Sequence, residues 1–197
     1  MIAVIDSGIA NLTSVMAALN RLGAEAEVTT NLTIIKKADY IILPGVGAAA
    51  PAMSRLQRLQ LVELLRSLTQ PVLGICLGMQ LLFEHSDESG GVSCLGLFPG
   101  KVKMLPASPE TPVPHMGWNQ LIFKQNNHPL LRNIPEGSYV YFVHSFAAPV
   151  TSQTVAGTLY GLEFMAMASV RNFMGCQFHP ERSGKVGSQI LGNFLRV

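Results

Sequence analysis

The sequence predicts one α/β domain over residues 1–197, with a doubly wound, mainly parallel sheet, helices on both faces and an additional mixed or antiparallel strand section. In the first 84 residues, short apolar runs alternate with segments of helical period, which is typical of parallel β-α-β units. After residue 118, several strand-like runs follow one another without helices, which indicates antiparallel pairing. The chain is 48% hydrophobic and 13% charged, a composition that can bury a large core.

The first half of the chain contains the parallel strands and their crossover helices. Apolar runs bounded by turn residues predict strands over residues 2–5, 24–29, 40–43 and 71–75. Segments with one apolar face predict helices over residues 12–22, near 34, over 61–68 and over 79–84. Asn11 is a favoured N-cap for the first of these helices, and Gly23 ends it.

The second half of the chain is richer in turns. Residues 85–114 are polar with many glycines and prolines, so we expect loops and short strands there, one of them over 102–105. Further strands are expected over residues 121–123, 139–143, 155–159, 165–170 and 173–178. Val186, Ile190 and Phe194 form an apolar stripe on a final helix, which we assign to the core.

A cysteine lies between two glycines where the strand over residues 71–75 turns into a helix. Gly74-Ile75-Cys76-Leu77-Gly78 has the plan of a G-x-S-x-G nucleophile elbow, with sulfur in place of oxygen. The N-terminus of the following helix would favour a thiolate and a developing oxyanion. A lone cysteine is more often a small buried hydrophobic residue, so a catalytic role requires a base elsewhere in the chain.

His179 and Glu181 can provide that base. They lie about a hundred residues downstream, at the end of the predicted strand over residues 173–178, and Pro180 prevents further strand pairing. At this spacing the carboxylate can fix the tautomer of the imidazole, which then takes the thiol proton. We therefore predict a catalytic triad of Cys76, His179 and Glu181.

These two stretches resemble the class I (triad-type) glutamine amidotransferases, whose glutaminase domain has Cys, His and Glu in this order and spacing. Three further stretches resemble a branch of that family, the glutaminase subunits of imidazole glycerol phosphate synthases. They are Leu43-Pro44-Gly45-Val46-Gly47, Pro114-His115-Met116-Gly117-Trp118-Asn119 and Tyr141-Phe142-Val143-His144-Ser145. The family more often has Thr-Tyr where this chain has Ser145-Phe146.

The resemblance implies hydrolysis of L-glutamine to L-glutamate and ammonia. The ammonia would pass to a (β/α)8-barrel cyclase subunit that makes imidazole glycerol phosphate and an aminoimidazole carboxamide nucleotide. The resemblance also implies that the N–H groups of Val46 and Leu77 form the oxyanion hole. Because glycines flank Val46, its peptide can turn away at low cost, so we expect the chain to be nearly inactive without its partner.

The same resemblance assigns roles to further residues. The substrate-binding residues that it implies are Gly45, Gly47, Gln80, Glu88 and Ser145. In the family the matching glutamate binds the amino group of glutamine, and the residue matching Ser145 contacts its carboxylate. The residues expected at the partner interface are Trp118, Asn119 and Arg182. Arg182 stands where the family commonly has a lysine paired with a carboxylate of the cyclase.

Composition argues against several other classes of protein. The net charge is +2 and the 14 basic residues are not clustered, so we expect no nucleic-acid partner. Three cysteines without a C-x-x-C unit predict neither a disulfide framework nor a zinc site, and fit a reducing cytoplasm. Residues 1–6 resemble a strand more than a signal peptide, and residues 71–83 are too few to span a bilayer. The triad needs no metal or cofactor.

Three alternative functions remain open from the sequence. The chain could be the glutaminase of another synthase, such as anthranilate or aminodeoxychorismate synthase, although the stretch over residues 114–119 argues against this. It could be a catalytically silent regulatory protein on the same fold. It could also be a thiol hydrolase that acts on γ-glutamyl bonds.

Overall fold

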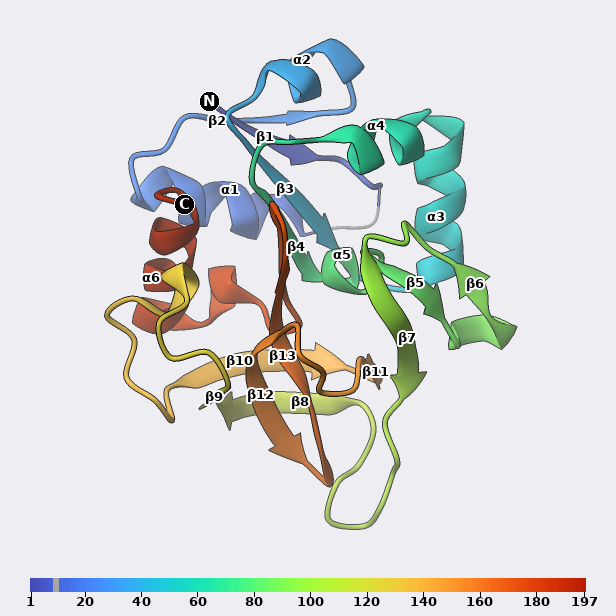
Figure 1. The fold of residues 1–197 in the computed structure, drawn as a ribbon, viewed down its shortest axis with the longest axis vertical. Helices are drawn as coiled ribbons and strands as arrows, with labels where there is room; N and C mark the ends of the chain where they lie inside the picture. Colours follow the sequence, from blue (N-terminus) through green and yellow to red (C-terminus); the bar gives the residue numbers. More distant parts are fainter. Residues whose placement is uncertain (9–10) are drawn as a thin grey trace.

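The computed structural model describes residues 1–8 and 11–197, and an eight-stranded sheet lies at its centre (Figure 1). The strand order is β2-β1-β3-β4-β14-β13-β12-β9. Five neighbouring strands are parallel: β2 (Ala26–Thr29), β1 (Ile2–Ile5), β3 (Tyr40–Gly45), β4 (Val72–Cys76) and β14 (Phe173–Cys176). The remaining three continue the sheet in antiparallel pairs: β13 (Leu162–Val170), β12 (Thr154–Tyr160) and β9 (Ile122–Phe123). The predicted fold class is confirmed.

Helices cover both faces of this sheet, as Figure 1 shows. On one face lie α1 (Leu12–Arg21) and α6 (Gly184–Phe194), and on the other lie α2 (Leu32–Lys37), α3 (Ala49–Arg58) and α4 (Leu61–Ser67). Strand β1 explains why both faces are apolar. Ile2 and Val4 pack with the first pair of helices, and Ala3 and Ile5 pack with the second group, because successive side chains point to opposite faces.

Two smaller sheets lie beside the large one. The first has the order β11 (Phe146–Ala147), β7 (Phe98–Met104), β5 (Phe83–Ser86) and β6 (Val92–Ser93). The second pairs β10 (Tyr139–His144) with β8 (His115–Gln120). Short 3-10 turns complete the chain: η1 (Glu88–Gly90), η2 (Pro129–Leu131) and η3 (Pro180–Arg182).

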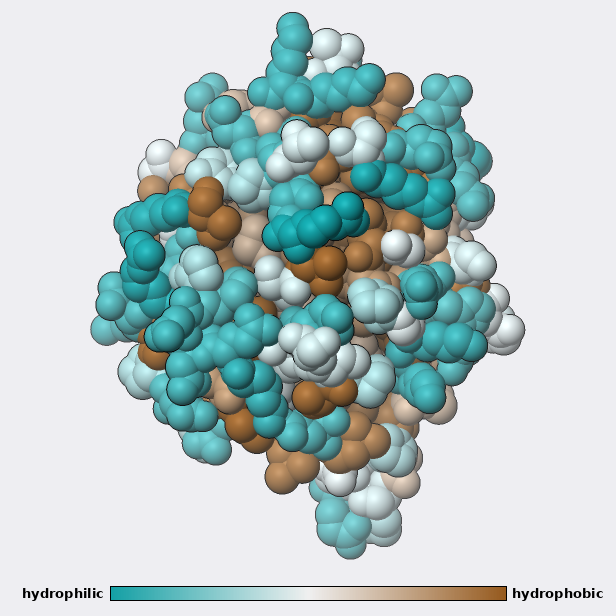
Figure 2. Space-filling model, in the orientation of Figure 1, coloured by the Kyte–Doolittle hydropathy of each residue, from teal (hydrophilic) through white to brown (hydrophobic). Residues whose placement is uncertain are grey.

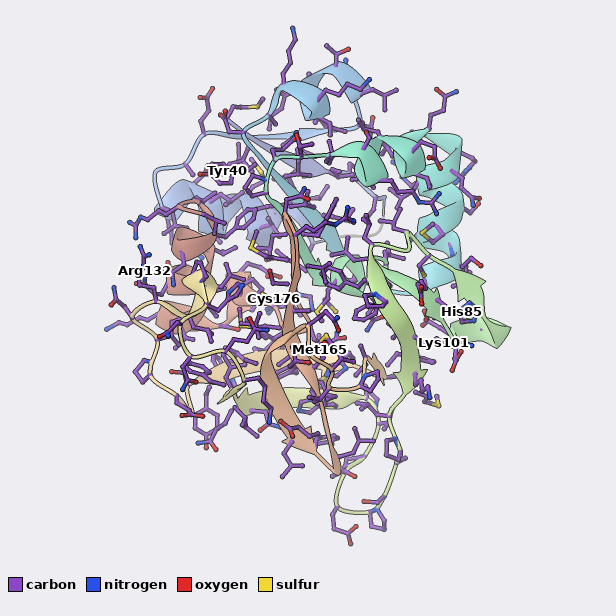
Figure 3. The ribbon with its side chains drawn as sticks, in the orientation of Figure 1. Tyr40, His85, Lys101, Arg132, Met165 and Cys176 are labelled. Atoms are coloured by element: carbon purple, nitrogen blue, oxygen red, sulfur yellow. The ribbon has the colours of Figure 1, made fainter. Side chains whose placement is uncertain are left out.

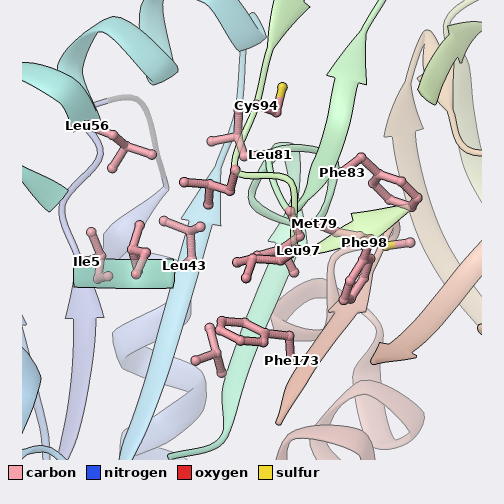
Figure 4. Close-up of a cluster of buried hydrophobic side chains, with 14 of the residues drawn as sticks. Ile5, Leu43, Leu56, Met79, Leu81, Phe83, Cys94, Leu97, Phe98 and Phe173 are labelled. Carbon is pink, nitrogen blue, oxygen red and sulfur yellow. The ribbon is translucent and has the colours of Figure 1, made fainter. Parts of the chain in front are cut away.

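The first small sheet is attached to the large one through a common hydrophobic cluster. Phe83 and Phe98 meet edge to face, with ring centroids 5.3 Å apart. Figure 4 shows both rings beside Met79 and Leu97, with Phe173 of the large sheet in the same cluster. All five side chains are buried, so this part of the chain shares its core with the large sheet.

One predicted helix differs from the structure, and two elements of the structure were not predicted. The helix expected over residues 79–84 was wrong in extent: α5 (Leu77–Gln80) is a single turn, and residues 83–84 belong to β5. A continuous apolar run does not distinguish helix from strand by periodicity, and pairing of β5 with β6 and β7 decides the outcome. Helix α3 and strand β8 were not predicted. The buried positions of α3 have helical spacing, but two of the four are alanines and its first turn contains Pro51, which hides the pattern.

The surface view in Figure 2 shows mainly hydrophilic residues on this face, with smaller hydrophobic areas between them. Within the described part of the chain, none of the helices has the length and apolar character needed to cross a membrane.

Candidate active site

Cys76 occupies a strained turn between strand β4 and helix α5. Its backbone has φ 53° and ψ −112°, a conformation that L-residues rarely adopt. The two flanking glycines allow this close passage of strand and helix. A Cβ atom at Gly78 would lie 1.7 Å from the Leu43 carbonyl oxygen, and one at Gly74 would lie 2.7 Å from the Met79 nitrogen. The local sequence therefore produces a nucleophile elbow.

His179 reaches the elbow because strand β14 pairs beside β4. Cys176 of β14 lies opposite Ile75, so the segment after β14 emerges next to Cys76. The His179 N–H donates to the Tyr141 carbonyl at 2.9 Å, which fixes the backbone of this segment. The fold thereby brings residues about a hundred positions apart to the same edge of the sheet, where sites form in open α/β folds.

His179 and Glu181 form a buried pair. Nδ1 of His179 lies 2.8 Å from Oε1 of Glu181, and their side chains are 6% and 2% exposed. A carboxylate accepts only, so Nδ1 carries the proton and donates it. Nε2 of His179 has no hydrogen-bond partner among the described residues, and His179 lines the same pocket as Cys76. This arrangement leaves Nε2 available to exchange a proton with the sulfur or with a substrate.

Three influences set the protonation of His179. Burial lowers its pKa, but the Cys76 sulfur and the Glu181 carboxylate together outweigh burial and raise the pKa from 6.5 to about 10. An imidazolium is therefore favoured beside a negatively charged nucleophile.

The pocket in front of Cys76 has a volume of about 270 Å³. Its lining includes seven further residues predicted for the site: Val46, Gly47, Leu77, Gln80, Glu88, Ser145 and His179. Gly45 lies behind this wall and has a packing role, because a Cβ atom there would be 3.0 Å from the Leu77 Cβ and 3.1 Å from the Gly78 nitrogen. Apart from Gly45, the predicted oxyanion-hole and substrate residues thus surround one cavity.

Several polar groups of the pocket are held by the protein itself. Gln80 Nε2 donates to the Phe146 carbonyl at 2.9 Å and to Gln177 Oε1 at 3.0 Å. Glu88 Oε2 accepts the Ala49 N–H at 2.6 Å, at the start of α3. Gln177 was not predicted as a site residue, although its spacing of two from His179 places both on one side of the extended segment and could have indicated it.

The other two cysteines lie away from this pocket. Figure 3 shows Cys176 near the centre of the fold, where it is fully buried. Burial, with a smaller effect of Glu181, raises the pKa of Cys176. Burial also raises the pKa of the Cys94 thiol, to about 11, with a further contribution from Glu88. Both thiols are therefore poor nucleophiles, and Cys76 is the one cysteine of the three that lines the pocket.

Of the residues expected at a partner interface, Trp118 and Asn119 point to opposite sides of strand β8, and Arg182 lies on the same side as Trp118. Trp118 is 55% exposed and packs on Tyr141 of β10, with ring centroids 6.0 Å apart. The Arg182 guanidinium lies 5.9 Å from the Tyr141 ring centre, so it belongs to the same outer surface. Asn119 has the opposite orientation: its Nδ2 donates to the Leu159 carbonyl at 3.0 Å and lies 3.4 Å from His115 Nε2.

Comparison with known proteins agrees with this fold. The family model for class-I glutamine amidotransferases matches residues 3–197. The chain therefore belongs to the class-I glutamine amidotransferase family.

Within that family, the chain is similar over its whole length to curated proteins named imidazole glycerol phosphate synthase subunit HisH. It is 47% identical to the one from Yersinia pseudotuberculosis, with 100% of this chain and 99% of that protein covered. It is 53% identical to the one from Idiomarina loihiensis, with 100% and 97% covered.

Solved structures show the same fold at low sequence identity. PurLQS from Thermotoga maritima has a TM-score of 0.71 at 18% identity, with 99% of this chain and 97% of that chain covered. The glutaminase domain of Trypanosoma brucei CTPS has a TM-score of 0.66 at 13% identity, with 99% and 93% covered.

Proposed function

We propose that this chain is the glutaminase subunit of an imidazole glycerol phosphate synthase and releases ammonia from L-glutamine for histidine biosynthesis. One observation carries the proposal. Cys76 on its strained elbow and His179 line one pocket of about 270 Å³, and Glu181 holds the His179 ring from behind at 2.8 Å. The full-length similarity to HisH subunits supports this synthase over anthranilate or aminodeoxychorismate synthase. An intact triad argues against a silent regulatory protein.

The reaction begins when the Cys76 thiolate attacks the side-chain amide carbon of glutamine. A C–S bond forms, and the carbonyl electrons move to oxygen, where the N–H groups of Leu77 and Val46 stabilise the charge. The His179 imidazolium then gives its Nε2 proton to the amide nitrogen, the C–N bond breaks, and ammonia leaves a thioester. Throughout, Glu181 accepts the Nδ1–H of His179 and keeps Nε2 directed at the reacting atoms.

A water molecule completes the cycle. Neutral His179 takes a proton from the water through Nε2 as the oxygen attacks the thioester carbon. The C–S bond breaks, glutamate leaves, and the thiolate and imidazolium are restored together. The raised pKa of His179, about 10, favours the imidazolium form in which the cycle ends.

The rest of the pocket would bind the α-amino and α-carboxylate groups of glutamine. The Nε2 group of Gln80 already donates to protein acceptors, so its Oε1 is the atom that would accept from the substrate amine. Glu88 supplies a negative charge on the same wall, with Oε2 held by Ala49. Ser145 would donate to the carboxylate, through its hydroxyl or its backbone N–H.

The outer face of strands β8 and β10 would bind the cyclase subunit. We call it the docking face, and it consists of Met116, Trp118, Tyr139, Tyr141, Val143 and Arg182. Met116, Trp118 and Tyr139 are 66%, 55% and 53% exposed, an unusual concentration of large apolar side chains. Arg182 would pair there with a carboxylate of the partner. Because all three cysteines are free and Cys76 must remain reduced, we place the complex in the cytoplasm.

The experiment combines the purified chain with a cyclase subunit of imidazole glycerol phosphate synthase. We expect glutamate release that requires the complex, and Cys76→Ala should abolish it while synthesis from added ammonia continues. Losing a member of a catalytic unit typically lowers the rate by several powers of ten. Glutamate release near the parent rate by Cys76→Ala, or faster cleavage of a γ-glutamyl peptide than of glutamine, would overturn the proposal.

A further inference from the structure

The side chain of Gln177 connects the substrate wall of the pocket to the nucleophile. Gln177 is 1% exposed and lies between strand β14 and His179. Its Oε1 accepts the Gln80 Nε2 at 3.0 Å, and its own Nε2 donates to the Cys76 sulfur at 3.8 Å. Both ends of this buried amide are therefore used, and one of them contacts the reacting atom.

The direction of this hydrogen-bond chain follows from the group at its far end. The Phe146 carbonyl can only accept, so the Gln80 amide must present its nitrogen there. The same nitrogen faces Gln177, which must then present its oxygen. The remaining end of the Gln177 amide, its N–H, is thereby directed at the sulfur. The Phe146 carbonyl oxygen thus determines that Cys76 receives a donor.

The sulfur has a second contact with the opposite preference. Cys76 Sγ lies 3.9 Å from the Val143 carbonyl, to which a thiol can donate but a thiolate cannot. The N–H of Gln177 interacts more strongly with a charged sulfur than with a neutral one, because hydrogen bonds to ions are the stronger kind. Removing that N–H would leave the His179 imidazolium to stabilise the thiolate, against the Val143 contact that favours the protonated thiol.

We propose that Gln177 is a catalytic residue that stabilises the Cys76 thiolate, and that Gln80 is a positioning residue that orients the Gln177 amide. This role deepens the proposed glutaminase function and rests on it. Gln80 then has two tasks, since its nitrogen directs Gln177 while its oxygen faces the substrate.

The test measures alkylation of Cys76 by iodoacetamide as a function of pH, followed by mass spectrometry of the Cys76 peptide in the full chain. Only the thiolate reacts, so the pH midpoint reports its stability and the limiting rate at high pH reports access. Gln177→Leu removes the donor at similar size. We expect the midpoint to lie about one pH unit higher, so that alkylation is about tenfold slower at pH values below the parent midpoint, as loss of a hydrogen bond to an ion predicts.

Two further variants complete the design. Gln80→Leu should raise the alkylation midpoint by less than Gln177→Leu does. In this variant the Gln177 amide is still present, but it has lost the partner that orients it. Gln125→Leu is the matched control, because the Gln125 amide also makes two hydrogen bonds, to the carbonyls of Ser152 and Thr154, outside the pocket lining. We expect its midpoint to be unchanged.

An unchanged midpoint in Gln177→Leu would overturn the proposal. If that variant does not fold, an unchanged midpoint in Gln80→Leu decides against it in the same way. The alkylation assay uses no glutamine and no partner, so its result is independent of whether the complex hydrolyses glutamine. In the assembled complex, Gln177→Leu should also lower kcat/KM about tenfold at pH values below the parent midpoint, and kcat/KM should recover at higher pH.

Discussion

The buried pair of His115 and His144 should make the fold sensitive to mild acid. His115 Nδ1 lies 3.0 Å from His144 Nε2, and His144 Nδ1 lies 2.8 Å from the Phe146 carbonyl. The carbonyl accepts, so His144 Nδ1 is the donor and its Nε2 accepts from His115. His115 Nε2 in turn faces the Asn119 amide at 3.4 Å. Neither ring can take a second proton without losing one of these contacts.

Burial also opposes protonation of both rings. It lowers the pKa of His115 from 6.5 to about 4. Burial is likewise the main cause that lowers the pKa of His144 to about 3, with the neighbouring charges of His115 and His179 acting in the same direction and the Phe146 carbonyl opposing them. Each folded pKa lies below its unfolded value, so the associated stability is complete above pH 6.5 and is lost as the pH falls.

The magnitude follows from proton uptake by the unfolded chain. Each pH unit below 6.5 removes about 1.4 kcal/mol per histidine, hence about 2 kcal/mol for each ring at pH 5. The two rings share a contact and are coupled, so we expect a combined loss of roughly 2–4 kcal/mol between pH 7 and pH 5. His179 opposes this loss only weakly, by less than about 1 kcal/mol, because its raised pKa already provides most of its stabilisation at pH 7.

Urea unfolding at pH 7, 6 and 5 measures this loss in the intact chain. In His144→Asn the amide nitrogen can still donate to the Phe146 carbonyl, but the side chain no longer titrates. We expect this variant to lose about half as much stability as the parent over the same range. His85→Asn, at a partly exposed position on β5, is the control and should behave as the parent. An identical loss in His144→Asn and the parent would refute the role assigned to the histidine pair.

Four further outcomes are expected. Cys76→Gly should be at least as stable to urea as Cys76→Ala. Glycine relieves about 1–3 kcal/mol of backbone strain, which offsets the roughly 1.5 kcal/mol that its flexibility and the lost methyl group cost. A clearly lower stability of the glycine variant would contradict the strain. Gly187→Ala would place Cβ 1.9 Å from the Pro180 carbonyl oxygen, so about 1–3 kcal/mol of stability and part of the glutaminase rate should be lost together. Arg182→Ala should weaken binding of the cyclase, as measured by calorimetry, by at most ~1 kcal/mol if Arg182 forms an exposed ion pair. Unchanged affinity and unchanged ammonia transfer would remove Arg182 from the interface. Glutaminase assays of the chain alone should give rates roughly 10²–10³ below those of the ligand-bound complex if the Val46 N–H points away at rest, and equal rates would show a preformed oxyanion hole.

The parallel sheet, the elbow and the three residues proposed as the triad could be predicted from the sequence. These features depend on local rules: glycine spacing around Cys76, apolar runs long enough for buried strands, and a proline that ends strand pairing after His179. Where the local signal was ambiguous, prediction was less successful. The apolar residues after Gln80 suit either a helix or a strand, and their partners in β6 and β7 decided for a strand.

Contacts between distant side chains could not be predicted from the sequence, because they depend on strand order and register. Strand β8 alternates its residues between two faces, and its antiparallel register with β10 turns Trp118 outward and Asn119 inward. The link from Phe146 through Gln80 and Gln177 to Cys76 joins segments as far as 101 positions apart, and no local pattern specifies such contacts. Strand order and register set these distances, and both depend on burial of the whole sheet between its two layers of helices.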